Sequence, residues 1–195
     1  MNDNPSPDLH HKKTDMGSSE AEFNFDEIRS VGKQDICHFK KMVIKSQRNR
    51  YRLCLHSEQT HLTQEMIICL KGFNYFQPHM PIGLRSKSYH MIEGVLDVYL
   101  FEENGRLVDV IKLGAPESIK IGTESRDFMY RLSAPLYTLV IPRSEWTIYH
   151  EVFTGPWSKD GAHKYASFAP TENDIEGIKE YIFQITGFTI EKILI

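Results

Sequence analysis

Histidine and tyrosine side chains at strand ends are the residues of this sequence that could transfer protons. His79 follows an extended run and precedes a loop that contains Pro81 and Gly83. Small β-barrels hold the side chains of their pockets at such strand ends. Two roles stay open for His79, a hydrogen-bonded structural residue and a general base or ligand anchor. Tyr89 and Tyr137 lie in runs of strand character, and either would serve as a proton donor if its hydroxyl faces the pocket.

Cationic and aromatic residues of the same region are candidates for ligand binding. Arg85 and Lys87 follow in the loop. Lys87 is either a solvated lysine or a pocket cation that holds a phosphate or carboxylate. Tyr75 is a core or rim aromatic that could stack on a sugar or a nucleobase. His90 directly follows Tyr89, so only one of these two side chains faces inward on a strand.

The elements that must position these residues are short strands. Apolar and alternating runs recur about every ten residues and are punctuated by glycine and proline, which is typical of an all-β sandwich or barrel. The clearest hairpin joins residues 95–101 to 107–113, and Asn104-Gly105 favours a type I′ turn between them. The further strands are expected within residues 42–55 and at 65–70, 116–121, 128–132, 137–141 and 147–153.

Both ends of the chain differ from this pattern. Residues 1–22 are polar and rich in proline, glycine and serine, which predicts a disordered tail. A helix is expected to start near Asp26, and a second, amphipathic helix is expected over residues 173–185 with Gly187 as its stop. The sequence thus divides into the tail at 1–22, a β-domain at 23–172 and a helical extension at 173–195.

Charge and cysteine content narrow the partners and the compartment. The 195 residues carry 23 basic and 26 acidic side chains, a net charge of −3, so no basic field for nucleic acid or an anionic membrane is expected. Cys37, Cys54 and Cys69 make an odd number without CxxC spacing, which favours reduced thiols. Neither a signal sequence nor an 18-residue apolar run is evident. A cytoplasmic protein is therefore expected.

The run from about Arg48 to Glu172 resembles the WbuC-type cupins. The likeness is carried by RYRLCLH at 50–56, MIICL at 66–70, PH at 78–79, SYHMIEG at 88–94, EV at 151–152, GPW at 155–157 and FAPTE at 168–172. It also includes Tyr75 and the segment LF at 100–101 with Asn104-Gly105. The resemblance implies a cupin double-stranded β-helix, a small jelly-roll barrel, and a role in surface-polysaccharide or O-antigen biosynthesis.

The resemblance also implies where a divalent metal would be held, and the sequence departs from that pattern. Cupins of this type use His-x-His, a Glu seven residues before a glycine, and a third His. Here His79 keeps the first place, whereas Pro81, Lys87 and Thr138 stand in the other three. Proline has no ligand atom and a lysine cation repels a metal. The metal site is therefore expected to be lost, with no cofactor, and Thr138 joins the candidate ligand-binding residues.

Three functions follow as hypotheses. The first is binding of a small anionic sugar or nucleotide-sugar in a pocket lined by His79, Arg85, Lys87 and tyrosines. The second is a metal-independent nucleotide-sugar isomerase or epimerase, with His79 as base and Tyr137 or Tyr89 as acid. The third keeps a metal through replacement ligands, with His56 and His90 beside His79. Open sheet edges make a homodimer plausible in each case.

Overall fold

The computed structural model describes residues 20–83, 85–119, 125–158, 161 and 163–190. The predicted disordered tail lies outside these residues except for Glu20, Ala21 and Glu22, and Ala21 and Glu22 belong to the first strand instead. The strands are β1 (Ala21–Phe23), β2 (Arg50–Cys54), β3 (Thr63–Lys71), β4 (His79–Pro81), β5 (Lys87–Glu93), β6 (Val95–Phe101), β7 (Leu107–Gly114), β8 (Met129–Leu132), β9 (Tyr137–Pro142), β10 (Trp146–Thr154) and β11 (His163–Tyr165). The helices are α1 (Lys33–Lys45), the short 3-10 helix η1 (Pro116–Ser118) and α2 (Ile175–Thr186).

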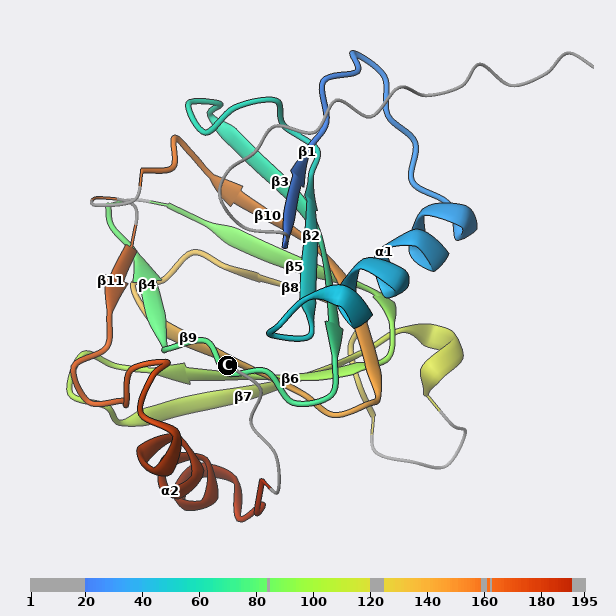
Figure 1. The fold of residues 1–195 in the computed structure, drawn as a ribbon. Helices are drawn as coiled ribbons and strands as arrows, with labels where there is room; N and C mark the ends of the chain where they lie inside the picture. The colour runs from blue at the N-terminus through green and yellow to red at the C-terminus, as the bar shows by residue number, and fades with distance from the viewer. Residues whose placement is uncertain (1–19, 84, 120–124, 159–160, 162, 191–195) are drawn as a thin grey trace, which may run out of the picture.

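Two sheets face each other (Figure 1). One has the order β1-β2-β3-β10-β5-β8 and the other β11-β4-β9-β6-β7. Eight of these strands form the quartets β3-β10-β5-β8 and β4-β9-β6-β7, and the chain alternates between the quartets except at the β6–β7 hairpin. This is the order of a jelly roll, which confirms the predicted all-β class and the small jelly-roll barrel.

The β6–β7 hairpin forms where the sequence predicts it, with a different turn. Gly105 has φ 82° and its N–H donates to the Glu102 carbonyl at 3.0 Å. Asn104 is not left-handed, so the turn is not type I′. The register instead shifts between Leu100 and Phe101, which accommodates a longer loop.

Helix α1 begins later than the sequence predicts and replaces the start of the expected strand at 42–55. The Gly32 N–H donates to the Asp35 carboxylate at 2.8 Å, which satisfies a donor at the helix start. Phe39 and Val43 then bury one face of the helix against Tyr51 and Ile67 on the outer face of the β3 sheet. Tertiary packing of this stripe outweighs the weak strand signal of residues 42–45.

Helix α2 forms over nearly the predicted range. The Asp174 side chain accepts a hydrogen bond from the Gly177 N–H at 3.0 Å, and Gly187 ends the helix in the left-handed conformation with φ 74°. Ile178 and Ile182 pack on the outer face of the β9 sheet. A third cluster of apolar side chains fills the space between the two sheets. Residues 116–118, predicted to be extended, form η1 instead.

Candidate functional site

A cavity of about 290 Å³ lies between the two sheets. Side chains from both quartets and from the flanking strands β1, β2 and β11 line it. Tyr89, Tyr149 and Glu151 face it from the β3 sheet, and His79 and Thr138 face it from the other. Because side chains alternate along a strand, these residues share one face only with every second neighbour. The alternation along β10 therefore brings Tyr149, Glu151 and Phe153 inward together.

His79 begins β4 and is paired in register with Thr138 of β9. Its ring packs edge-on against His163, with 4.9 Å between the ring centroids. Its Nδ1 lies 3.1 Å from the Gln77 carbonyl oxygen. A carbonyl oxygen only accepts, so Nδ1 carries the proton and Nε2 is left as a hydrogen-bond acceptor. The backbone of the preceding loop thus sets the tautomer of His79.

His79 and His163 are neutral at physiological pH. Burial, reinforced by the charge of Lys87 and by the His163 ring, lowers the pKa of His79 to about 3. Burial and the charges of Lys87 and Arg85 lower the pKa of His163 to about 4. A base with so low a pKa is poorly matched to proton abstraction at pH 7. These imidazoles are better suited to hydrogen bonding with a ligand.

Lys87 is the buried cation of this region. It starts β5 on the same face as Tyr89, with only 3% of its surface exposed. Its Nζ lies 5.8 Å from the centroid of the Tyr89 ring and has no hydrogen-bond partner in the described part of the chain. Burial lowers its pKa to about 8, an effect that the Glu151 charge opposes. The ammonium group therefore remains mainly protonated at pH 7 without a bonded counter-ion.

Acidic and hydroxyl groups surround this cation. Burial raises the pKa of Glu151, while the charges of Lys87 and Arg52 oppose the shift. The Thr138 and Tyr130 hydroxyls are buried without hydrogen-bond partners in the described residues, although the Tyr130 hydroxyl lies toward Tyr89 and Thr138. Buried polar atoms are normally satisfied, so the unsatisfied hydroxyl of Thr138, which lines the cavity, marks a place for a polar ligand or water.

The structure brings four of the predicted residues together. His79, Tyr89 and Thr138 line the cavity, and Lys87 lies against Tyr89. The predicted Glu and third-His positions of the cupin pattern, Lys87 and Thr138, are therefore neighbours of His79 in space.

Two of the predicted tyrosines are not in the cavity, which corrects the assignment of Tyr137 as an acid and Tyr75 as a ligand-binding residue. Tyr137 is one residue from Thr138 on β9, so it faces the α2 side, and its hydroxyl donates to Glu103 at 3.3 Å. Tyr75 lies in the same outer cluster, and its hydroxyl donates to the Pro170 carbonyl at 2.8 Å.

His90 and Arg85 also lie outside the cavity lining. His90 is on the opposite face of β5 from Tyr89, with its Nδ1 3.3 Å from Nδ1 of His150. The guanidinium of Arg85 donates to the Pro156 carbonyl at 2.7 Å, and only its charge reaches the site, through the pKa of His163. His90 is therefore not brought together with His79, although His56 does line the cavity.

Sequence reasoning missed three residues of the site. His163 is not among the predicted site residues, but β11 places it half-buried beside His79. Glu151 and Tyr149 are identified as site residues only by the strand register, which places Glu151 opposite Tyr89. The inward alternation of residues 149, 151 and 153 was a usable signal. The short strand at 163–165 gave no such signal in the sequence, because three residues are too few to show a periodicity.

The residues around His79 do not fit a divalent metal. Its sequence-predicted partners supply a lysine cation and a neutral hydroxyl, which are poor donors for such an ion. Within the ranges that the structure covers, no group of three or more His, Cys, Asp or Glu side chains is arranged to hold one. The expected loss of the metal site stays a prediction.

The strand order of the two quartets is that of the cupins. The chain has the cupin fold. The profile of a domain of unknown function, DUF6016, matches residues 32–113. No curated protein matches the chain.

Several solved structures are similar to parts of this chain. Protein SO0799 from Shewanella oneidensis is 9% identical, with a TM-score of 0.45 over 64% of this chain and 68% of that one. Capsular polysaccharide assembling protein CapF from Staphylococcus aureus is 4% identical, with a TM-score of 0.47 over 59% of this chain and 29% of CapF. The Cnp3 cupin domain of Schizosaccharomyces pombe is 8% identical, with a TM-score of 0.39 over 56% and 63%. The chain thus spans less than a third of the length of CapF.

In the described residues no helix is both long enough and apolar enough to cross a membrane.

Proposed function

We propose that the cavity binds a small anionic sugar or a nucleotide-sugar and that Lys87 holds an anionic group of this ligand. The observation that carries the proposal is the Lys87 ammonium group, which is buried, mainly protonated at pH 7 and without a hydrogen-bond partner in the described chain. An unpaired buried cation is costly, so a bound carboxylate or phosphate would relieve that cost.

Neutral groups around Lys87 suit the remainder of a sugar ligand. Nε2 of His79 accepts a hydrogen bond, and the Thr138 and Tyr130 hydroxyls are available to donate or accept. The pKa of Tyr89 is raised far above its usual value by burial, so its hydroxyl stays protonated. A polyhydroxylated ring offers matching partners for all of these groups. The resemblance to the WbuC-type cupins favours surface-polysaccharide biosynthesis as the setting.

Isothermal titration calorimetry tests the proposal with galacturonate, a sugar acid, and with galactose, its uncharged counterpart. The wild-type chain should bind galacturonate and bind galactose at least tenfold more weakly. Lys87→Met should abolish the difference, whereas Lys41→Met, which removes an exposed lysine of α1, should preserve it. Equal binding of both sugars by the wild type, or a Lys87→Met variant that still prefers galacturonate, would contradict the assignment of Lys87.

An isomerase or epimerase is a second candidate, with a change in the expected base. The low pKa of His79 disfavours it as the base, whereas Glu151 has a raised pKa and lies opposite Tyr89 in register. Incubation of a keto-sugar nucleotide in deuterated water would show deuterium at the carbon beside the ketone if this chemistry occurs. Loss of that exchange in Glu151→Gln, with retained binding, would assign the base.

A further inference from the structure

A pair of arginines lines the same cavity away from Lys87. Arg50 of β2 is paired with Leu70, and Leu70 is paired with Thr147 of β10. Lys87 is paired with Phe153 of the same strand. Thr147 and Phe153 are six residues apart on β10, which corresponds to about 20 Å of backbone at about 3.3 Å per residue. The arginines of the cavity lining and the buried Lys87 therefore lie at two levels along β10.

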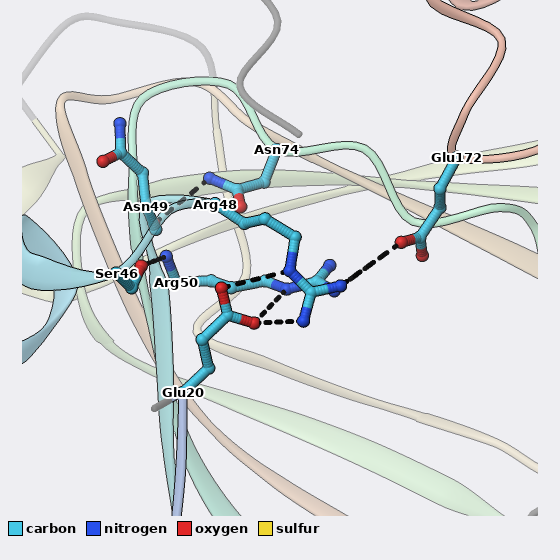
Figure 2. Close-up of polar contacts among 7 residues, drawn as sticks. All are labelled: Glu20, Ser46, Arg48, Asn49, Arg50, Asn74 and Glu172. Carbon is cyan, nitrogen blue, oxygen red and sulfur yellow. Dashed lines mark hydrogen bonds and ion pairs between the residues drawn. The ribbon is translucent and has the colours of Figure 1, made fainter. Parts of the chain in front are cut away.

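The arginine pair is held in place by its local structure (Figure 2). Asn49, between the two arginines, is left-handed with φ 50°. The Ser46 hydroxyl accepts from the Arg50 N–H at 2.9 Å, and the Asn74 side chain donates to the Asn49 carbonyl at 3.4 Å. The Arg50 guanidinium also lies 4.7 Å from the centroid of the Phe76 ring. Fixed guanidinium groups lose little further entropy on binding an anion.

Two carboxylates converge on these guanidinium groups. Glu20 accepts from Arg48 Nε at 3.0 Å, also binds Arg48 NH2, and lies 3.3 Å from Arg50 Nε. Glu172 lies 3.7 Å from Arg48 and 3.6 Å from Arg50. Figure 2 shows the two carboxylates approaching from different sides. Burial would raise the pKa of Glu20, but the hydrogen bonds and charges of the arginines outweigh this and lower it.

The carboxylates and the arginines differ in their place in the chain. Glu20 precedes β1 and Glu172 lies between β11 and α2, so both come from segments outside the eight jelly-roll strands. Arg50 begins β2, which is bonded directly to the jelly roll through β3, and Arg48 lies two residues before it. The flanking segments thus supply an anion to a pair of cations that already faces the cavity.

We propose that Arg48 and Arg50 form a second anion subsite, which takes the diphosphate of a nucleotide-sugar and which Glu20 occupies as an intramolecular substitute. Two neighbouring guanidinium groups match the geometry of phosphate oxygens. This inference deepens the proposed function and rests on it for the sugar end of the ligand.

Inorganic pyrophosphate is the probe for the arginine subsite, because it has no sugar ring for His79 and the neighbouring hydroxyls to bind, and Lys87→Met separates any binding at Lys87 from binding at the arginines. We expect Glu20→Gln to bind pyrophosphate about tenfold more tightly than the wild type, since one competing charged hydrogen-bond acceptor is removed. Glu22→Gln is the matched control: it removes the same charge two residues away, where the side chain bonds Tyr51 instead of the arginines. It should leave pyrophosphate binding unchanged.

Arg50→Met should weaken pyrophosphate binding at least tenfold and leave galacturonate binding intact, and Lys87→Met should do the reverse. If Arg50→Met fails to fold by circular dichroism, Arg48→Met tests the same subsite. Glu20→Gln that binds pyrophosphate no more tightly than wild type would overturn the inference and assign the cluster a structural role. If the wild-type chain binds pyrophosphate but not galacturonate, the proposed function is contradicted and the arginine subsite is still supported.

Discussion

Lys87 and Glu151 are opposite charges placed diagonally on neighbouring strands, without a hydrogen bond between them. Lys87 pairs in register with Phe153 and Glu151 pairs with Tyr89, so the two charged residues are one step out of direct opposition on the inner face. Each still shifts the pKa of the other toward the charged form. The two charges thus interact electrostatically, but no hydrogen bond joins them.

Lys87→Met should make the protein more stable. Methionine has a similar length and replaces a buried cation that lacks a bonded partner, so the free energy of unfolding at pH 7 should rise by about 1 to 3 kcal/mol. Urea denaturation of wild type, Lys87→Met and Lys41→Met measures this. A destabilised Lys87→Met variant would mean that the ammonium group is paired in solution.

The stability of the protein should fall as the pH is lowered from 6.5. Unfolded histidine takes up a proton near pH 6.5, whereas burial, Lys87 and His163 hold the pKa of His79 at about 3. Between these values the unfolded state binds more protons, which costs up to about 1.4 kcal/mol per pH unit for this one group. Denaturation between pH 4 and 7 should show a smaller slope for His79→Asn. An identical slope would mean that groups other than His79 take up the protons on unfolding.

Tyr137→Phe and Tyr89→Phe should have different effects on ligand binding. Tyr137 faces α2 and loses only its bond to the exposed Glu103, so galacturonate binding should be unchanged and stability should fall by less than about 1 kcal/mol. Tyr89 lines the cavity, and removing its hydroxyl should weaken binding several-fold. Calorimetry on both variants tests the face assignment of β9. Weaker binding by Tyr137→Phe would show that this assignment is wrong.

Gly94→Ala should destabilise the barrel by at least about 2 kcal/mol. Gly94 has φ 79°, and an added Cβ would lie 2.0 Å from the Trp146 carbonyl oxygen. Gly72→Ala is a matched control, because Gly72 also has a positive φ of 63° but its Cβ would meet no atom within 4 Å. Thermal unfolding should show a much larger loss for Gly94→Ala. Equal losses would attribute the effect to the backbone conformation alone.

The jelly roll could be predicted because short strands and glycine or proline breaks are local properties of the sequence. The resemblance also located three inward residues, His79, Lys87 and Thr138, since the spacing of a motif carries information on register. Tyr137 and His90 were candidate site residues, but their side chains face away from the cavity. Adjacent strand residues face opposite sides, and the sequence alone does not say which side is the cavity.

Other features depend on contacts that the local sequence does not contain. The position of α1 is set by burial against Tyr51 and Ile67, and the place of His163 is set by pairing of β11 with β4. The arginine pair draws its counter-charges from Glu20 and Glu172, which lie far apart in the sequence. Such partners meet only after the barrel has closed.

The order of the strands also constrains how the chain can acquire its structure. The centre of one sheet pairs Thr63–Lys71 with Trp146–Thr154, and β9 lies between β4 and β6 at the centre of the other. A ribosome must therefore release β10 before β3 can pair with this second neighbour beside β2, which favours slow, late closure of the whole domain. The segment that matches DUF6016, residues 32–113, ends before β9 and β10. That segment therefore lacks the strands that lie at the centre of both sheets.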